Sequence, residues 1–291
     1  MQPLRASPRS PAAVAPFAAP SWTPRPLALE RGVTEVVEAG AGPPLLLIPP
    51  LPGFKEAYAE LLPRLARAFR VVAFDVRERF DTRPRLPQAV ADVARVADAA
   101  GFERCALFGH SLGGAIAQAF ALAHPERVAA LVLSSSFAFV TTPARGAPAR
   151  WLEQPLVVAA LRVLPERAAT RLARVLAKHS RWVFDPRCDE RVCALMVAGV
   201  KRLRLSRLRE QIALALEYDL RRASGAIATP TLLVAGERDT AFALDQLETL
   251  AGRIPGAERA RSPGVGHLHP LSNPEWLADT LQRWLARRIH A

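Results

Sequence analysis

Short apolar runs alternate with amphipathic stretches along most of this chain. Four of the runs, 43–49, 69–76, 104–111 and 128–136, are rich in the Val, Ile, Leu and Phe side chains that favour strands. They are apolar almost throughout, as the strands of a parallel sheet are when helices cover both faces. An earlier stretch, 27–38, alternates between apolar and polar residues and predicts one or two further strands.

The stretches between these runs have the spacing of helices. Residues 55–69, 88–101 and 113–128 place apolar side chains three and four positions apart. Strands that alternate with helices predict a parallel sheet built by crossover connections. The alternation stops near Phe137, after the sixth strand, and the chain then remains helix-like to about Arg222.

Strand patterns return after this helical insertion. Residues 228–239 and 257–267 predict two more strands, and residues 273–289 predict a closing helix with Asn273 as its N-cap and Pro274 just inside. We therefore divide the chain into a disordered tail rich in Pro and Ala (1–26), an α/β core (27–137 and 222–291) and a helical cap (138–221).

The composition is that of a globular protein, with 50% hydrophobic residues and a formal net charge of +12. Such a charge can indicate binding to nucleic acid or to an anionic membrane. The arginines are scattered, however, and no aromatic residues interleave with them, so we predict no nucleic-acid partner. The densest basic cluster, 201–209, shares its stretch with Leu205, Leu208, Ile212 and Leu216, which predicts an amphipathic helix with a solvated basic face.

Targeting and cysteine patterns point to a cytoplasmic protein. No apolar run approaches the length of a membrane-spanning helix, and residues 1–26 lack the continuous apolar segment of a secretory signal. Cys105, Cys188 and Cys193 have neither the spacing of a redox pair nor that of a zinc site. We predict unpaired thiols, no metal and no other cofactor.

The candidate chemistry begins at Ser111. Residues 109–113, Gly-His-Ser-Leu-Gly, match the pattern G-x-S-x-G between an apolar run and a helical run. In this strand–turn–helix setting the serine is the nucleophile of a nucleophile elbow, whose strained turn admits only small residues two positions to either side. Gly109 and Gly113 meet that need. The alternative is a glycine-rich helix start that Ser111 merely caps.

A serine nucleophile needs a base and a carboxylate that orients the base. Asp239 lies just past a predicted strand end, and Glu237, nearer the strand, is the alternative acid. His267 lies in a short glycine-flanked loop after the last predicted strand, and His269 is its rival.

Two other ionisable residues adjoin these positions. We expect His110 to pack behind the nucleophile. Asp75, at the end of the strand over 69–76, either faces the site or anchors a loop.

The chain resembles α/β-hydrolase-fold proteins from about Leu27 to the C-terminus. The resemblance implies a mostly parallel eight-stranded sheet with flanking helices, a helical cap after strand six, and a triad of Ser111, Asp239 and His267. Within that fold, the stretches 45–61, 108–121 and 131–138 are together most similar to the maspardin branch, which has a Pro-Pro pair, here Pro49-Pro50, where most relatives have His-Gly. The motifs that carry the resemblance are FGHSLGG (108–114), AHPERVAALVLSSS (123–136), TPTLLVAGERD (229–239) and GVGHLHPL (264–271).

The fold implies a role for the proline-rich loop 49–52. Acyl transfer develops negative charge on the carbonyl oxygen, and preorganised backbone N–H groups stabilise that charge. One donor follows the nucleophile, here Leu112, and the other comes from the loop after the third strand. The neighbouring prolines have no N–H, so Leu51 is the predicted second donor. The alternative is a rigid loop that only shapes the pocket.

These residues predict a cofactor-free serine hydrolase, a carboxylesterase that acts on a small to medium apolar ester through an acyl-enzyme. The expected partner is a small-molecule ester-like substrate, and the sequence carries no signal for the oligomeric state. The main alternative is a non-catalytic binding or adaptor protein of the maspardin type. A third hypothesis is attachment to anionic lipid through the basic cap helix.

Overall fold

The computed structural model describes residues 22–140, 157–179 and 190–289. The predicted tail lies outside the described residues up to position 21, as does Cys188. The first strand begins at Arg25, two residues before the predicted start of the core. Cys105 and Cys193 are buried, and Cys105 carries a free thiol.

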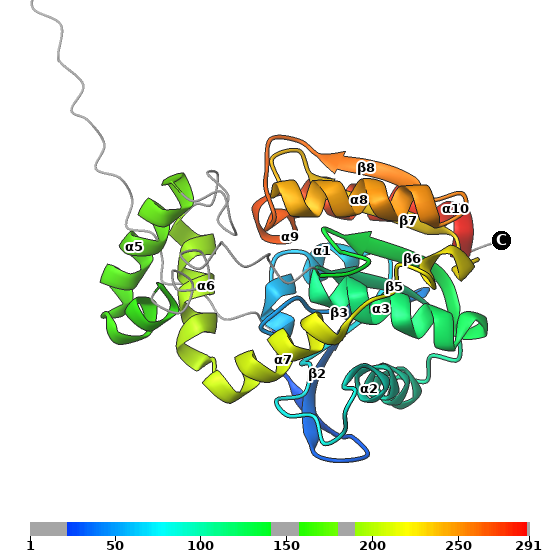
Figure 1. Cartoon of the computed structure of the whole chain (residues 1–291), viewed down its shortest axis with the longest axis horizontal. Coiled ribbons are helices and arrows are strands. Elements are labelled where there is room, and N and C mark those ends of the chain that lie inside the picture. Colours follow the sequence, from blue (N-terminus) through cyan, green and yellow to red (C-terminus); the bar gives the residue numbers. More distant parts are fainter. Residues whose placement is uncertain (1–21, 141–156, 180–189, 290–291) are drawn as a thin grey trace, which may run out of the picture.

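One sheet of eight strands, in the order β1-β2-β4-β3-β5-β6-β7-β8, forms the centre of the described chain (Figure 1). β1 pairs antiparallel with β2, β2 pairs antiparallel with β4, and the remaining pairs are parallel. The predicted mostly parallel sheet is therefore confirmed. Its strands are β1 (Arg25–Ala28), β2 (Val33–Ala39), β3 (Pro44–Ile48), β4 (Arg70–Phe74), β5 (Cys105–His110), β6 (Val128–Ser134), β7 (Thr231–Gly236) and β8 (Glu258–Ser262).

Helices cover both faces of this sheet, as its apolar inner strands require. Successive strand residues point to opposite faces, so Leu46 and Ile48 of β3 belong to one core cluster and Leu45 and Leu47 to the other. Helices α2, α3 and α8 pack on the first face, and α1 and α10 pack on the second. The core helices are α1 (Leu62–Leu65), α2 (Leu86–Ala99), α3 (Leu112–Ala123), α8 (Ala241–Arg253), α9 (His269–Ser272) and α10 (Pro274–Ile289).

A helical cap follows β6, at the predicted position. Its helices α5 and α6 project from the sheet and share a small apolar cluster with Ala59 and Leu271 of the core, whereas α7 leads back onto the core (Figure 1). Residues 157–163 are also helical. The other cap helices among the described residues are α5 (Glu166–His179), α6 (Glu190–Arg202) and α7 (Leu205–Glu217), and the short turn η3 (Ser224–Ala226) precedes β7.

The single helix predicted over 55–69 is wrong. This segment forms the short 3-10 helix η1 (Lys55–Tyr58) and then the single-turn helix α1. Pro63 lies in the first turn of α1, where its missing N–H needs no partner. The proline therefore begins a new helix instead of continuing the previous one.

The basic residues of 201–209 are largely solvated, as predicted: the side chains of Arg202 and Arg204 are 58% and 76% exposed. The apolar side of the predicted helix differs, since Leu205 and Leu216 of α7 are 60% and 40% exposed while Gln211 is fully buried. Three of the arginines also attach the cap to the core, because the core surface below them presents carboxylates and a carbonyl group. Their contacts are Arg202 with Glu56 (3.0 Å), Arg204 with Glu78 (3.3 Å) and Arg207 with the carbonyl oxygen of Val76 (2.6 Å).

Candidate active site

Ser111 occupies a strained turn between β5 and α3. Its backbone angles are φ 52° and ψ −116°, a conformation that costs a non-glycine residue about 1–3 kcal/mol. A Cβ atom on Gly109 would lie 2.4 Å from the carbonyl oxygen of Gly113, and one on Gly113 would lie 2.0 Å from that of Ile48. Backbone packing therefore requires both glycines, which is the physical reason for the spacing G-x-S-x-G.

Asp239 and His267 lie in the loops that follow the neighbouring strands β7 and β8. Nδ1 of His267 is 2.9 Å from Oδ1 of Asp239. The alternative acid, Glu237, instead accepts a hydrogen bond from the backbone N–H of Gly264 at 2.7 Å. The rival base, His269, contacts Ser134 and not Asp239. The fold thus pairs the two residues that the sequence ranked first.

The carboxylate of Asp239 is buried, and three donors surround it. Oδ2 accepts a hydrogen bond from Oγ of Ser135 at 2.5 Å, and Oδ1 accepts one from the backbone N–H of Thr240 at 2.7 Å. Burial raises the pKa of Asp239, but the charge of His267 and the hydrogen bonds from His267 and Ser135 outweigh it and hold this pKa well below the usual range. The carboxylate therefore stays ionised at neutral pH.

Sequence reasoning missed Ser135. Its backbone has φ 46°, a strained value for a residue with a Cβ atom, and its hydroxyl reaches the carboxylate of Asp239. The run Ser134–Ser136 at the end of β6 was the available signal. Only the folded sheet shows that this end lies beside the loop after β7.

Two further histidines pack beside His267. Oγ of Ser134 lies 2.9 Å from Nδ1 of His110 and 2.9 Å from Nε2 of His269. The ring of His110 is 5.0 Å from that of His267 and 5.6 Å from that of His269. Burial, together with the charges of the other histidines, lowers the pKa of His110 well below its usual value. Burial lowers the pKa of His269 to about 4, so both imidazoles are neutral at pH 7.

The end of β6 connects Ser111 to this group. The backbone N–H of Ser111 donates to the carbonyl oxygen of Ser134 at 2.8 Å, and Oγ of Ser136 donates to the carbonyl oxygen of Ser111 at 3.1 Å. Within the described part of the chain, no hydrogen bond joins the Ser111 side chain to His267. Such bonds are often long in enzymes without substrate and shorten when substrate binds.

The proline-rich loop after β3 lies against the start of α3. A Cβ atom on Gly113 would lie 2.7 Å from the carbonyl oxygen of Pro49. The N–H of Gly53 donates to the carbonyl oxygen of Pro50, which closes a turn around Leu51. Leu51 is 36% exposed, and its amide has no hydrogen-bond partner among residues 22–140, 157–179 and 190–289. The amide is thus available to a ligand.

Asp75 anchors this loop, which is one of the two roles considered for it. Oδ1 of Asp75 accepts a hydrogen bond from the backbone N–H of Lys55 at 2.9 Å. The side chain of Lys55 is fully buried, with Nζ 2.7 Å from Glu35 and 3.4 Å from Asp75. This buried ion cluster was not predicted. It holds the segment that follows the loop against β2 and β4.

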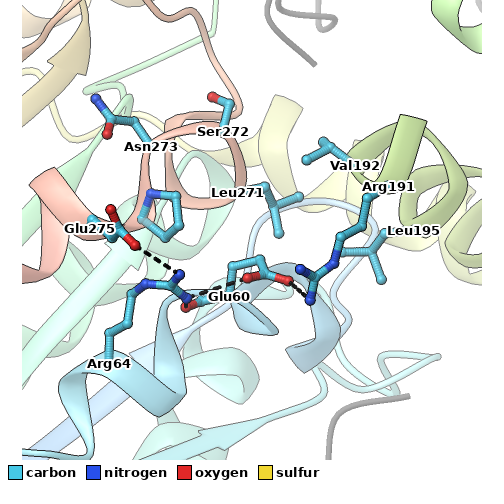
Figure 2. Close-up of a pocket in the computed structure, with 10 residues that line it drawn as sticks. Glu60, Arg64, Arg191, Val192, Leu195, Leu271, Ser272, Asn273 and Glu275 are labelled. Atoms are coloured by element: carbon cyan, nitrogen blue, oxygen red, sulfur yellow. Dashed lines mark hydrogen bonds and ion pairs between the residues drawn. The ribbon is translucent and has the colours of Figure 1, made fainter. Parts of the chain in front are cut away.

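Two cavities lie between the cap and the core, and neither is lined by Ser111, Asp239 or His267. The first, of about 240 Å³, lies between α6 and the segments around α1 and α9. Its wall contains Glu60, which binds Arg191 of the cap and Arg64 of the core (Figure 2). The second, of about 200 Å³, is lined by Phe54, Asp75 and arginines of the cap.

Among the described residues, no group of three or more His, Cys, Asp or Glu side chains is arranged to hold a metal ion.

No helix in the described segments is long and apolar enough to cross a membrane.

Comparison with known proteins agrees with this architecture. A pimeloyl-[acyl-carrier protein] methyl ester esterase of Xanthomonas campestris is 28% identical over 255 residues, 85% of this chain and 96% of that protein. A putative carbamate hydrolase, RutD, of Azorhizobium caulinodans is 31% identical over 249 residues, 83% of this chain and 91% of that protein. The crystal structure of a hydrolase from Pseudomonas aeruginosa has a TM-score of 0.70 and 26% identity, and the match covers 92% of this chain and 99% of that one.

The family model for the α/β hydrolase fold matches residues 43–274. This match includes every strand from β3 to β8, together with Ser111, Asp239 and His267. The chain therefore belongs to the α/β-hydrolase fold family.

Proposed function

We propose that this protein is a serine hydrolase that cleaves a carboxylic ester through an acyl-enzyme. Ser111 attacks the carbonyl carbon while His267 takes the proton from its hydroxyl. The tetrahedral intermediate then collapses, the ester C–O bond breaks, and the alcohol leaves with the proton from His267. Asp239 orients the imidazole of His267 and stabilises its charged form. The backbone N–H groups of Leu51 and Leu112 bind the oxyanion.

The observation that carries this proposal is the hydrogen bond between His267 and Asp239 at the sheet edge where Ser111 is held in its strained turn. If Nδ1 of His267 carries the proton that Asp239 accepts, Nε2 is left free as the base. In the second half of the reaction, His267 takes a proton from water, and the hydroxide attacks the acyl-enzyme. Ser111 then leaves with the proton from His267, and the acid is released.

Esterase chemistry fits the named relatives, which are esterases and hydrolases. We take the substrate to be a small to medium ester of mainly apolar character, since the cap is rich in Leu, Val and Ala. We also propose a cytoplasmic location, which the buried free thiol of Cys105 supports.

The resemblance to the maspardin branch stays a prediction that rests on the stretches 45–61, 108–121 and 131–138. A non-catalytic binding protein of that type has no need of a buried, ionised carboxylate beside a histidine. The pairing of Asp239 with His267 therefore favours catalysis over that alternative.

Labelling with a fluorophosphonate tests the proposal directly. Wild-type protein should form a covalent adduct on Ser111, detected by mass spectrometry of the labelled peptide, and Ser111→Ala should not. Circular dichroism of both proteins controls for folding. Folded wild-type protein that resists a range of fluorophosphonates would favour the binding-protein alternative.

A further inference from the structure

Helix α7 of the cap crosses the strand end that carries Ser111. The side-chain amide of Gln211 lies against Gly53, in the loop after β3, where a Cβ atom would come within 2.3 Å of Nε2. Directly after α7, the ring of Tyr218 packs edge to face on Phe137, which follows β6, with centroids 5.5 Å apart. Because β5 lies between β3 and β6 in the sheet, α7 spans the end of β5.

Ion pairs hold α7 in this position from the side. The buried guanidinium of Arg85 is 2.9 Å from Glu210 and also contacts Glu217, two carboxylates on α7. Arg207, also on α7, donates to the carbonyl oxygen of Val76 in the segment after β4. The helix is therefore fixed to the core at several points, and Gln211 is presented in a defined position.

The amide of Gln211 is fully buried and unsatisfied. Among the described residues, neither Nε2 nor Oε1 has a hydrogen-bond partner, and the hydroxyl of Tyr218 on the same face is unpaired as well. By contrast, the equally buried Gln246 accepts a hydrogen bond from the backbone N–H of Ala138 at 3.0 Å. Leaving a buried amide without a partner is unfavourable, so such a group indicates that a ligand or water completes it.

We infer that Gln211 is a specificity-determining residue that binds a hydroxyl or amide group of the substrate beneath α7. An amide side chain donates through Nε2 and accepts through Oε1, so it is complementary to a group that does both. A purely hydrocarbon chain in the same place would leave the buried amide unpaired. The inference rests on the proposed function and refines it: the preferred ester carries one further polar group on its otherwise apolar chain.

Two pairs of esters test this inference. Ethyl 3-hydroxybutyrate and ethyl butyrate differ by a hydroxyl on the acyl chain, and 3-hydroxybutyl acetate and butyl acetate differ by one on the alcohol. Hydrolysis by wild type, Gln211→Met and Leu214→Met is followed in a pH-stat. Methionine preserves the length of glutamine without its polar atoms. Leu214 is a fully buried apolar residue of the same helix, so Leu214→Met is the matched control.

For one pair, wild type should prefer the hydroxylated ester, and Gln211→Met should lower the ratio of the two kcat/KM values about tenfold or more. Leu214→Met should keep the wild-type ratio. The melting temperature of Gln211→Met should equal or exceed that of wild type, because an unpaired buried amide is replaced by an apolar side chain. If Gln211 had a purely structural role, Gln211→Met would melt at a lower temperature than wild type.

Equal ratios in wild type and Gln211→Met for both pairs would overturn the inference and leave the proposed function intact. A lower melting temperature of Gln211→Met, together with unchanged kcat/KM ratios for both ester pairs, would also overturn the inference and leave the proposed function intact. If wild type hydrolyses none of the four esters and resists fluorophosphonate, the proposed function fails and this inference fails with it.

Discussion

Oγ of Ser135 donates a hydrogen bond to Oδ2 of Asp239, and the two oxygens are 2.5 Å apart. Ser135 follows β6 and Asp239 follows β7, so this bond connects two loops that are distant in sequence. It leaves Oδ1 of Asp239 to His267 and Thr240. The hydroxyl thereby fixes the orientation of the carboxylate plane toward the imidazole.

Ser135→Ala should lower kcat about tenfold, because the carboxylate of Asp239 loses one of its charge-assisted hydrogen bonds and is oriented less firmly. Steady-state hydrolysis of p-nitrophenyl esters measures the effect. Ser135→Gly removes the same hydroxyl but relieves the strain of φ 46°. It should match Ser135→Ala in kcat and melt at a higher temperature. Wild-type kcat in both variants would show that the hydroxyl plays no part in orienting Asp239.

Asp239→Asn should lower kcat by a factor on the order of 10³–10⁴ with the fold intact, since an asparagine can stabilise the wrong tautomer of His267. The comparison is made by single-substrate kinetics at pH 8, with melting curves as the check on folding. Glu237→Gln is the control, because Glu237 contacts the backbone of Gly264 and not His267. Comparable losses in the two variants, or loss in Glu237→Gln alone, would reject Asp239 as the acid.

Leu51→Pro should lose on the order of a hundredfold or more in kcat, because it removes the proposed oxyanion donor. Residue 51 precedes Pro52 and is already biased to the extended backbone that proline accepts. Leu51→Ala keeps the amide, and since the side chain is partly exposed, it should mainly change KM. Kinetics and melting curves of both variants provide the measurement. Equal losses, or near-normal activity of Leu51→Pro, would place the donor elsewhere.

His269 should make the protein less stable as the pH falls from 6.5 to 4. Burial lowers its pKa from 6.5 to about 4 in the folded state. In this window the unfolded chain binds a proton that the folded chain does not, so the stabilisation present above pH 6.5 is progressively lost. The contribution is on the order of 3 kcal/mol, from 1.36 kcal/mol per pKa unit. Two neighbouring groups also affect the dependence of stability on pH. The lowered pKa of His110 likewise makes the folded protein less stable as the pH falls. The lowered pKa of Asp239 affects stability only below about pH 3.8, the usual pKa of an aspartate, and so outside this window.

Urea unfolding at pH 7, 6, 5 and 4 measures this dependence. His269→Gln removes the titrating group and should flatten the curve between pH 6.5 and 4. His124→Gln, a substitution at a partly exposed position after α3, should follow the wild-type curve. An unchanged slope in His269→Gln would mean that His269 is not the source of the acid sensitivity.

Local signals in the sequence were sufficient for the strands, most helices and the nucleophile turn. The apolar runs at β3 to β6 are uniform because both faces of these strands are buried, so their pattern is visible without the fold. The spacing of Gly109, Ser111 and Gly113 is also local, since the clash that it avoids lies within one turn and the adjacent strand. The single helix predicted over 55–69 is wrong because the prediction followed the apolar spacing and did not take into account that Pro63 begins a new helix.

Only the tertiary structure could decide which groups meet across strands. Whether Asp239 or Glu237 reaches His267 depends on how the loops after β7 and β8 extend from the sheet edge, and no sequence period encodes that. The roles of Ser135 and Gln211 were hidden for the same reason. A serine after a strand and a glutamine in a helix both look like surface residues. Their burial is determined by the β7 loop and the cap helix that pack over them, whose positions depend on the completed sheet.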